Sequence, residues 1–321
     1  MKRYHLVVLA VTLLGLALAG CAGAAAPQPP QAAADVAEQA AAPATATPVA
    51  TATATATAAP TARAQVKVTS LRAERRAMLS QIAAIPAGKL LVGQWGLFGE
   101  GNAPESADEV LDEIYAQTGR YPAMTGADFG ALSASKQEVT DWLIAKSREG
   151  YIVAASYHME NPVTGGWVDD TDLDGQTLCD IPSNAQYQAD VDELAGYLQQ
   201  LEDAGVVVLW RPFHEMNGGW FWWGFENHDG CFDDLWQDLH RRLVRRHGLS
   251  NLLWVYSPNA PFGDASREFL MSGYPGDAYV DIVGLDKYGA WYDEELDLDE
   301  GYKLGFSVTT VDAWGAHARY F

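Results

Sequence analysis

The sequence predicts an α/β fold of the (β/α)8 barrel type, for three reasons. Short apolar segments alternate with helical segments, which is typical of a parallel sheet. No Gly-rich phosphate loop follows the first apolar segment, and this argues against a dinucleotide-binding fold. Polar and aromatic residues follow the ends of the apolar segments, which is where barrel proteins carry their functional side chains.

Six apolar segments are expected to form strands, so the barrel is expected to be incomplete, with about six of its eight strands. These segments are residues 89–95, 121–125, 151–157, 206–211, 252–257 and 280–286. Helices between them are predicted by capping signals and by apolar residues spaced three and four apart. The predicted helices cover residues 70–85, 135–150, 191–201, 232–247 and 301–316.

The composition restricts the class of partner. The 321 residues include 42 acidic and 21 basic ones, which gives a formal net charge of -21. Because phosphate binding needs a basic surface, no nucleic-acid partner is expected, and polyanionic substrates are disfavoured. The chain also contains 11 Trp and 14 Tyr, which suits a surface that stacks on flat rings.

The first 21 residues have the pattern of an export signal. Lys2 and Arg3 precede an apolar run at residues 6–18, which is too short to span a bilayer comfortably. The run ends in LAGC at residues 18–21, which resembles a bacterial lipobox and implies lipid on Cys21. The protein is therefore expected at the bacterial cell surface, with this lipid as its only membrane contact. An ordinary signal peptide with a chance cysteine would make it secreted instead.

Residues 22–66 are expected to be a disordered tether, because 34 of these 45 residues are Ala, Thr or Pro. The alternative of an Ala-rich helix is disfavoured by the prolines and by the alternation of Thr with Ala. Residues 67–321 remain as one domain, which is long enough to bury a core of its own.

The segment WRPFHEMNGGWFWWG, at residues 210–224, is the most informative part of the sequence. If the preceding strand continued, its period of two would point Arg211, Phe213 and Glu215 toward the barrel mouth. Apolar rings beside Glu215 would favour its neutral form, as a general acid requires, and Arg211 would oppose this. Indole rings stack on the flat faces of sugars, so the segment indicates a carbohydrate groove. The structural alternative is a buried Glu–Arg pair with the tryptophans as core.

Residues 210–224 closely resemble the acid/base segment of glycoside hydrolase family 26, whose best-known members are retaining β-mannanases with a (β/α)8 barrel. The resemblance covers most of residues 88–321. It implies that Glu215 is the catalytic acid/base, that His214 and Arg211 support it, and that Trp220 lines the adjoining sugar subsite.

Two further segments agree with this family. The segment SYHMENP at residues 156–162 is similar to the end of the family's third strand, which implies that His158 binds sugar. Residues 274–288 are similar to its sixth strand, which implies that Tyr288 lies next to the nucleophile. Taken alone, His158 would more often be a hydrogen-bonded structural histidine.

The nucleophile is the main departure from the family pattern. A retaining glycosidase needs two carboxylates about 5 to 5.5 Å apart. The family's nucleophile is a Glu at the end of the seventh strand, and none of the acidic residues after Tyr288 ends an apolar segment. We expect the nucleophile beyond Phe321, so this chain would be a C-terminally truncated, inactive fragment. Weaker candidates for that role are Asp128, Glu160 and Glu226.

The expected activity is hydrolysis of β-1,4-mannan within the chain, by a monomer. The resemblance also allows a mixed-linkage β-1,3-1,4-glucan or a β-1,3-xylan as substrate. A different class of function is a cell-surface glycan-binding lipoprotein without catalysis, which the absent nucleophile and the tether both suit. The intact acid/base segment argues against it, because a binding protein needs no proton donor.

The cysteines predict a disulfide and no metal site. Besides Cys21, the exported chain contains only Cys179 and Cys231, and an oxidising location favours a bond between them. The spacing of these cysteines and of the candidate histidines matches no metal-ligand pattern, so we expect neither a metal nor another cofactor.

Overall fold

The computed structural model describes most of the predicted domain. The described residues are 62–86, 91–97, 104–130, 134–224, 230–259, 267–286 and 309–310. The predicted export signal with Cys21 and most of the tether lie outside them, as does Tyr288.

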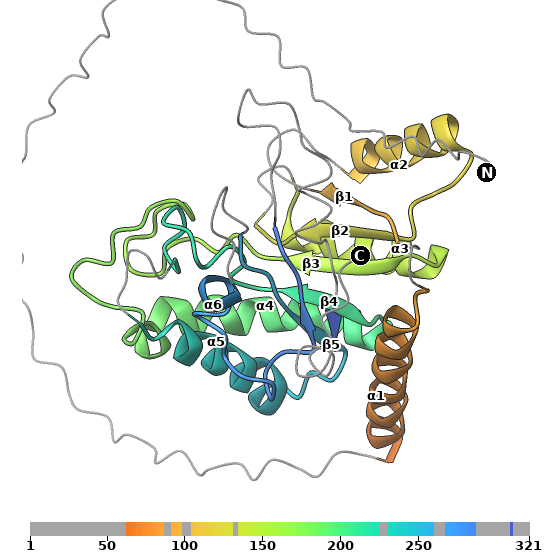
Figure 1. The fold of residues 1–321 in the computed structure, drawn as a ribbon. Helices are drawn as coiled ribbons and strands as arrows, with labels where there is room; N and C mark the ends of the chain where they lie inside the picture. The colour runs from red at the N-terminus through yellow and green to blue at the C-terminus, as the bar shows by residue number, and fades with distance from the viewer. Residues whose placement is uncertain are drawn as a thin grey trace, which may run out of the picture. The chain divides into compact units, whose positions relative to one another are not determined.

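A twisted sheet forms the centre of the domain, with its strands in sequence order from β1 to β7 (Figure 1). The first six strands pair in parallel, which confirms the predicted alternation of strands and helices. They are β1 (Gly93–Leu97), β2 (Met124–Asp128), β3 (Ile152–Ser156), β4 (Val208–Arg211), β5 (Leu252–Tyr256) and β6 (Ile282–Val283).

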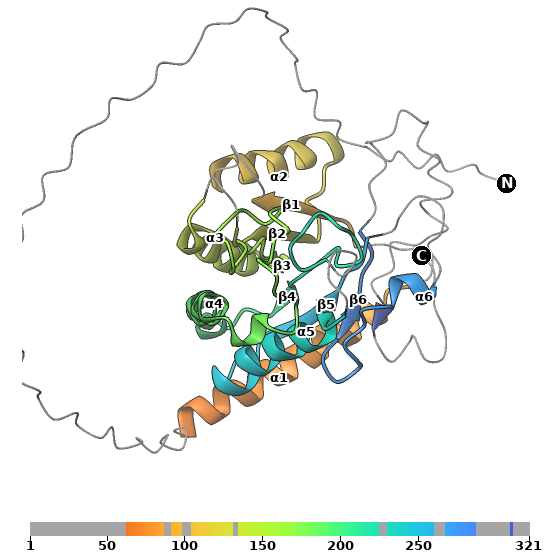
Figure 2. The same cartoon turned by 90° about the vertical axis from the view of Figure 1, so that its left-hand side faces the viewer.

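Helix α1 precedes β1, and the other helices lie between consecutive strands. They are α1 (Ala62–Ala83), α2 (Pro104–Thr118), α3 (Lys136–Glu149), η1 (Ile181–Ser183), α4 (Ala185–Asp203), α5 (Phe232–His240), the π-helical turn η2 (Arg241–Arg246) and α6 (Arg267–Leu270). The capping box of α3 forms as predicted, with Ser135 and Glu138 bonding each other's backbone N–H. Figure 2 shows α2, α3, α4 and α5 arranged along one side of the sheet.

The two faces of the sheet belong to different cores, because successive side chains of a strand point to opposite sides. Val208 and Trp210 of β4 lie in the main core, with the apolar faces of α3, α4 and α5. Leu209 lies in a second cluster, with Leu71 and Ile82 of α1. The first helix therefore covers apolar surface that the other helices do not reach.

Several element boundaries differ from the prediction. Helix α1 begins at Ala62, which is eight residues before the predicted start and inside the predicted tether. Helix α2 was not predicted, although Ala107, Leu111 and Ile114 have the spacing of one helical face and the first two are buried. Strand β2 lies three residues later than expected, so that Asp128 is its last residue.

The prediction of a helix at residues 301–316 is wrong for residues 309 and 310, in the middle of that range. Thr309 and Thr310 form the two-residue strand β7, which pairs antiparallel with β6. Threonine is β-branched and favours an extended backbone conformation. The backbone groups at the edge of β6 are therefore paired by a short strand instead of facing a helix. The rest of that predicted helix lies outside the described residues.

The register of the sheet brings three polar residues to one level at its carboxyl edge. Asp128 of β2 is paired with Ser156 of β3, and Ser156 is paired with Arg211 of β4. Further along the same edge, Asn259 forms an isolated parallel bridge with Asp286. Polar groups from five successive strands or their ends therefore meet at one side of the domain.

A disulfide joins Cys179 and Cys231, as the sequence analysis predicted, with their Cα atoms 5.0 Å apart. It links the long segment between β3 and α4 to the residue before α5. Both segments contribute to the carboxyl edge of the sheet, so the bond holds together two loops that are 52 residues apart in sequence.

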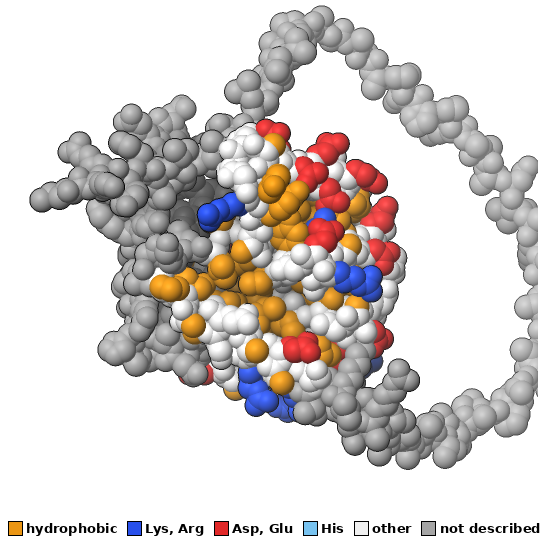
Figure 3. Space-filling model, turned by 90° about the vertical axis from the view of Figure 1, so that its right-hand side faces the viewer, with side chains coloured by type: hydrophobic (Ala, Val, Ile, Leu, Met, Phe, Trp, Pro, Cys, Tyr) orange, Lys and Arg blue, Asp and Glu red, His pale blue; other side chains and the backbone are white. Residues whose placement is uncertain are grey.

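The surface of the domain agrees with its acidic composition. Figure 3 shows one face on which Asp and Glu side chains gather over one part and apolar side chains form a band beside them. Among the described residues, none of the helices is long and apolar enough to cross a membrane.

Removing the disulfide should destabilise the domain. In the double variant Cys179→Ser/Cys231→Ser, the free energy of unfolding should fall by about 2–4 kcal/mol, because the unfolded chain regains the freedom of a closed loop. Urea unfolding followed by tryptophan fluorescence measures this. Reductant should reproduce the loss in the unmodified protein and leave the variant unaffected. Equal stability of the two proteins would contradict the predicted contribution.

Candidate active site

A tight turn after β4 carries the predicted acid/base residue. The strand ends at Arg211, and Pro212, which follows, has no N–H to extend the ladder. Phe213 and Glu215 then adopt left-handed backbone conformations, with φ of 45° and 54°. The prediction that strand periodicity continues to Glu215 is therefore wrong. Phe213 turns into the core, where its ring meets those of Trp222 and Trp223.

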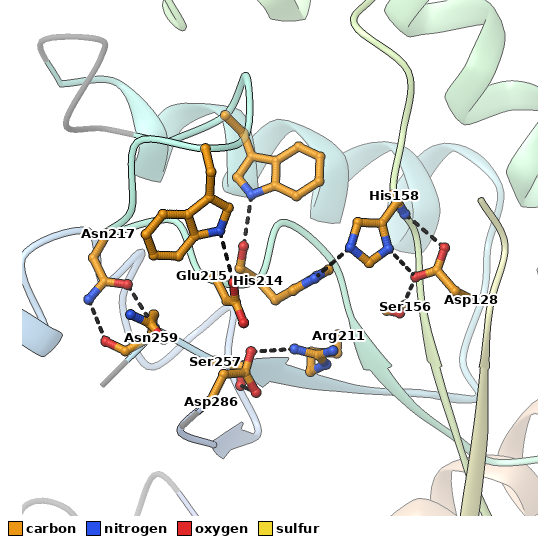
Figure 4. A network of polar contacts seen from close by, with 12 residues as sticks. Asp128, Ser156, His158, Arg211, His214, Glu215, Asn217, Ser257, Asn259 and Asp286 are labelled. Carbon is orange, nitrogen blue, oxygen red and sulfur yellow. Dashed lines mark hydrogen bonds and ion pairs between the residues drawn. The ribbon is translucent and has the colours of Figure 1, made fainter. Parts of the chain in front are cut away.

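Glu215 is held at the carboxyl edge of the sheet by its backbone and its side chain. Its N–H donates to the carbonyl of Ser257 at 2.8 Å, which ties the turn to the end of β5. The indole N–H of Trp220 donates to Oε2 of Glu215 at 2.9 Å (Figure 4). Only 4% of Glu215 is exposed, so its carboxyl group lies largely out of bulk water.

The three tryptophans at residues 220–223 divide into two groups by their exposure to solvent. Trp222 and Trp223 are fully buried, and their indole N–H groups donate to the carbonyls of Met159 and His214. Trp220 remains 43% exposed. Its ring lies against Gly218, where a Cβ atom would come within 2.3 Å of it, so a side chain at 218 would displace the ring. The exposed indole is therefore held beside Glu215 from two sides.

Two histidines and an aspartate form a connected network on the other side of the turn. Nδ1 of His158 lies 2.8 Å from Oδ2 of Asp128, and Nε2 of His158 lies 3.2 Å from Nε2 of His214. The rings of both histidines also meet the ring of Phe221 edge-on, at centroid distances of 5.3 and 5.4 Å. Both ring nitrogens of His158 therefore already have protein partners.

The network sets the charges of its members. Burial disfavours the charged form of Asp128, but the hydrogen bonds from His158 and Ser156 outweigh this and lower the pKa of the carboxyl group. For His214, burial and the nearby charge of Arg211 lower the pKa well below its usual value. His214 is therefore neutral at physiological pH, and the ring of His158 lies between it and the ionised Asp128.

Arg211 forms an ion pair with Asp286, which also accepts a hydrogen bond from the hydroxyl of Ser257 at 3.0 Å. The guanidinium lies over the ring of Trp95, with its central carbon 5.5 Å from the ring centroid. Burial raises the pKa of Asp286, and the charge of Arg211 opposes this. Arg211 and Asp286 therefore serve as partners that reduce the cost of each other's burial.

Asn217 and Asn259 fix the turn to the loop after β5. The amide N–H of Asn217 donates to the carbonyl of Asn259, and the N–H of Asn259 donates to Oδ1 of Asn217, both at 2.7 Å. Together with the Glu215–Ser257 bond, this gives the turn three hydrogen bonds to the neighbouring strand end.

Comparison with known proteins identifies the family. The model of glycosyl hydrolase family 26 matches residues 68–306. This chain belongs to glycosyl hydrolase family 26. A mannan endo-1,4-β-mannosidase of Bacillus subtilis is 35% identical over 211 residues, which is 58% of this chain and 57% of the relative. One of Thermothelomyces thermophilus is 32% identical over 262 residues, which is 73% of this chain and 50% of the relative.

The fold agrees with the family. A solved mannanase structure from Bacillus subtilis superimposes with a TM-score of 0.58 and 28% identity, and the match covers 73% of this chain and 76% of the other. The chain spans about half the length of the curated relatives it matches.

Most of the site residues inferred from the family 26 resemblance lie together. The cluster contains His158, Arg211, His214, Glu215 and Trp220 (Figure 4). Tyr288, Cys21 and the weaker nucleophile candidate Glu226 lie outside the described residues. Glu160, another such candidate, is exposed.

The structure adds cluster members to which the sequence analysis gave no role. They are Ser156, Asn217, Ser257, Asn259 and Asp286. It also gives Asp128, which was considered only as a nucleophile, the role of hydrogen-bond partner of His158. The available signal was position, because Asp128, Ser257, Asn259 and Asp286 each lie at or just past the end of an apolar segment. No group of three or more potential metal ligands occurs within the part of the chain that the structure describes.

The neutral state of His214 predicts acid destabilisation. Its pKa is lowered on folding, so below about pH 6.5 the unfolded chain binds a proton that the folded protein does not. The free energy of unfolding should therefore fall as the pH drops from about 6.5 toward 5. Urea titrations at each pH measure this, and NMR of the His214 ring should show no protonation over that range. Protonation of folded His214 near pH 6.5 would contradict the prediction.

Proposed function

We propose that the protein is a retaining endo-β-1,4-mannanase in which Glu215 is the general acid/base. The observation that carries this proposal is a buried carboxyl group, bonded to the indole N–H of an exposed tryptophan, at the carboxyl edge of a parallel sheet. Functional residues of barrel enzymes occupy that edge. In the first step Glu215 donates its proton to the glycosidic oxygen, and in the second it takes a proton from water.

The surroundings of Glu215 suit proton transfer. Only 4% of the residue is exposed, so a proton can pass between its carboxyl group and a bound ligand largely out of bulk water. The exposed ring of Trp220 offers a flat apolar surface beside the carboxyl group for a sugar to stack on. Proton donor and sugar platform therefore lie next to each other.

Mannan is the proposed substrate because the curated relatives are mannan endo-1,4-β-mannosidases. The net charge of -21 favours a neutral polysaccharide. A mixed-linkage β-glucan or a β-1,3-xylan is the alternative within the same fold. The choice depends on how the groove meets an axial or equatorial 2-hydroxyl group.

The nucleophile of the proposed mechanism is a second carboxylate that we do not assign to a described residue. Asp128 accepts hydrogen bonds from four donors, and Asp286 is paired with Arg211 and Ser257. Both carboxylates serve to hold other side chains of the cluster, so neither is assigned the role of nucleophile. A glycan-binding protein without catalysis is the second candidate, and these engaged carboxylates are the observation that favours it.

Replacing Glu215 should abolish most turnover. In the polypeptide expressed from its complete gene, Glu215→Ala should lower kcat on mannohexaose by about 100-fold to 10,000-fold, because proton transfer to the leaving group is lost. With an aryl mannobioside that has a good leaving group, azide should restore turnover and give the β-mannosyl azide. Product analysis by NMR measures both. The control Glu109→Gln changes an exposed carboxylate on helix α2 that has no role in the proposed site, and it should keep turnover.

Two results would count against the enzyme proposal. Unchanged turnover in Glu215→Ala would remove Glu215 from the mechanism. Binding of mannohexaose by the unmodified protein, measured by calorimetry, with no hydrolysis would favour the binding protein.

We also propose that the protein is an exported, monomeric lipoprotein anchored at Cys21. Cys21→Ser should abolish the incorporation of labelled palmitate in bacterial cells and move the protein from the membrane fraction to the soluble fraction. The reason is that stable anchoring requires covalent lipid. Labelling that persists in Cys21→Ser would contradict the proposal.

A further inference from the structure

Asp128 accepts hydrogen bonds from four donors, which is more than a carboxylate needs if it only fills space in the core. Its Oδ1 accepts the backbone N–H groups of Gly130 at 2.7 Å and His158 at 3.0 Å. Its Oδ2 accepts the hydroxyl of Ser156 and faces Nδ1 of His158 at 2.8 Å. Only 1% of Asp128 is exposed, so these donors replace water around a buried charge.

This arrangement determines where the proton of His158 lies. An ionised carboxylate only accepts hydrogen bonds, so the nitrogen that faces it, Nδ1, must carry the hydrogen. A second hydrogen on Nε2 of His158 would force Nε2 of His214 to accept and would leave the hydrogen of neutral His214 on its buried Nδ1, which has no acceptor. We therefore assign a neutral His158, whose Nε2 has a lone pair and accepts. The atom 3.2 Å from it is Nε2 of His214, which must therefore carry the hydrogen that forms the bond.

The other nitrogen of His214 supports the same assignment. Nδ1 of His214 is buried and has no hydrogen-bond partner. A buried N–H without an acceptor is costly, as is a buried charge. With the hydrogen on Nε2, His214 has its only N–H in the bond to His158 and leaves no donor unpaired. Burial also lowers the pKa of His214, which keeps the ring neutral.

We propose that Asp128 is a positioning residue that, through His158, places the proton of His214 on Nε2 and so holds the turn that carries Glu215. His214 directly precedes Glu215, and its carbonyl accepts the indole N–H of Trp223 at 2.8 Å. Its ring lies 4.6 Å from that of His158 and 5.4 Å from that of Phe221, centroid to centroid. A change in the hydrogen bond of His214 therefore acts on the segment next to the proton donor.

The catalytic part of this inference rests on the proposed function, whereas the proton positions do not. Asp128 is buried and its hydrogen-bond partners are Gly130, Ser156 and His158, so we infer that its effect on catalysis passes through the rings of His158 and His214. An aspartate that fixes a histidine's tautomer is a known way to support catalysis without taking part in proton transfer.

The variant Asp128→Asn makes a specific prediction. Two fixed backbone N–H groups face Oδ1, so the amide carbonyl should occupy that position and the amide NH2 should replace Oδ2. The NH2 donates, so His158 should move its hydrogen to Nε2 and donate to Nε2 of His214. His214 should then carry its hydrogen on Nδ1. Both rings should change tautomer.

The matched control is Ser156→Ala. It removes a hydrogen bond to the same carboxylate oxygen from a side chain that is fully buried, but it leaves a carboxylate opposite His158. The unmodified protein and Ser156→Ala should both have the hydrogen of His214 on Nε2, and Asp128→Asn should have it on Nδ1. Ring nitrogen NMR of the ¹⁵N-histidine-labelled full chain, near neutral pH and without substrate, measures these positions.

Each outcome decides the proposal. A hydrogen on Nδ1 of His214 in the unmodified protein overturns it, even if Asp128→Asn fails to fold. An unchanged tautomer in folded Asp128→Asn also overturns it, as does a changed tautomer in Ser156→Ala. The expected pattern in all three proteins supports it.

Turnover separates this inference from the proposed function. In the polypeptide from the complete gene, Asp128→Asn should lower kcat on mannohexaose by about 10-fold to 100-fold. This is less than the loss of about 10,000-fold when a histidine that itself transfers the proton takes the wrong tautomer, because Asp128 acts through two rings and not on the proton donor. KM should change little, because Asp128 does not reach the surface. An unchanged kcat in Asp128→Asn would overturn the positioning role. The kcat of Glu215→Ala tests the mannanase proposal independently.

Discussion

The turn after β4 is the constraint on which the rest of the site depends. The strand stops at Arg211, and two residues with side chains, Phe213 and Glu215, adopt left-handed backbone conformations. Each such conformation costs about 1–3 kcal/mol and persists only where the surroundings hold it. Here the core holds Phe213, and the carbonyl of Ser257 holds the N–H of Glu215. The turn therefore places a carboxyl group beside an exposed indole instead of in the core.

The carboxylates of the cluster have different surroundings and therefore different uses. Asp128 is stabilised in its charged form by its hydrogen bonds and by His158. For Asp286, burial disfavours the charged form and raises the pKa, and Arg211 and Ser257 reduce this effect. Glu215 accepts a hydrogen bond from the indole N–H of Trp220, the exposed aromatic residue of the cluster. It is therefore the carboxyl group that lies next to the proposed sugar platform, where a general acid/base has to be.

The sequence predicted the sheet and the chemistry-bearing segment because both depend on local patterns. Strand order and the capping box of α3 were predicted from apolar segments and cap residues. Helix α2 was missed although the helical spacing of Ala107, Leu111 and Ile114 was a local signal for it. Strand β7 was not predicted because it forms by pairing with β6, and there a tertiary contact, and not local propensity, determines the element.

The same distinction applies to the site. Residue types identified Glu215, His214 and Arg211, but not the partners of Arg211 or His158. Those partners, Asp286 and Asp128, come from strands that are distant in sequence, and only the register of the sheet brings them to the same edge. Strand periodicity failed past Arg211 because Pro212 and the left-handed residues that follow end the extended conformation.

The most direct test of this account is a crystal structure of the protein with a bound manno-oligosaccharide. The account predicts a glycosidic oxygen within about 2.6–3.2 Å of the Glu215 carboxyl group, with a mannose ring stacked on Trp220. A sugar bound elsewhere on the domain, with Glu215 sealed from it by the surrounding rings, would contradict the claim that Glu215 is the proton donor.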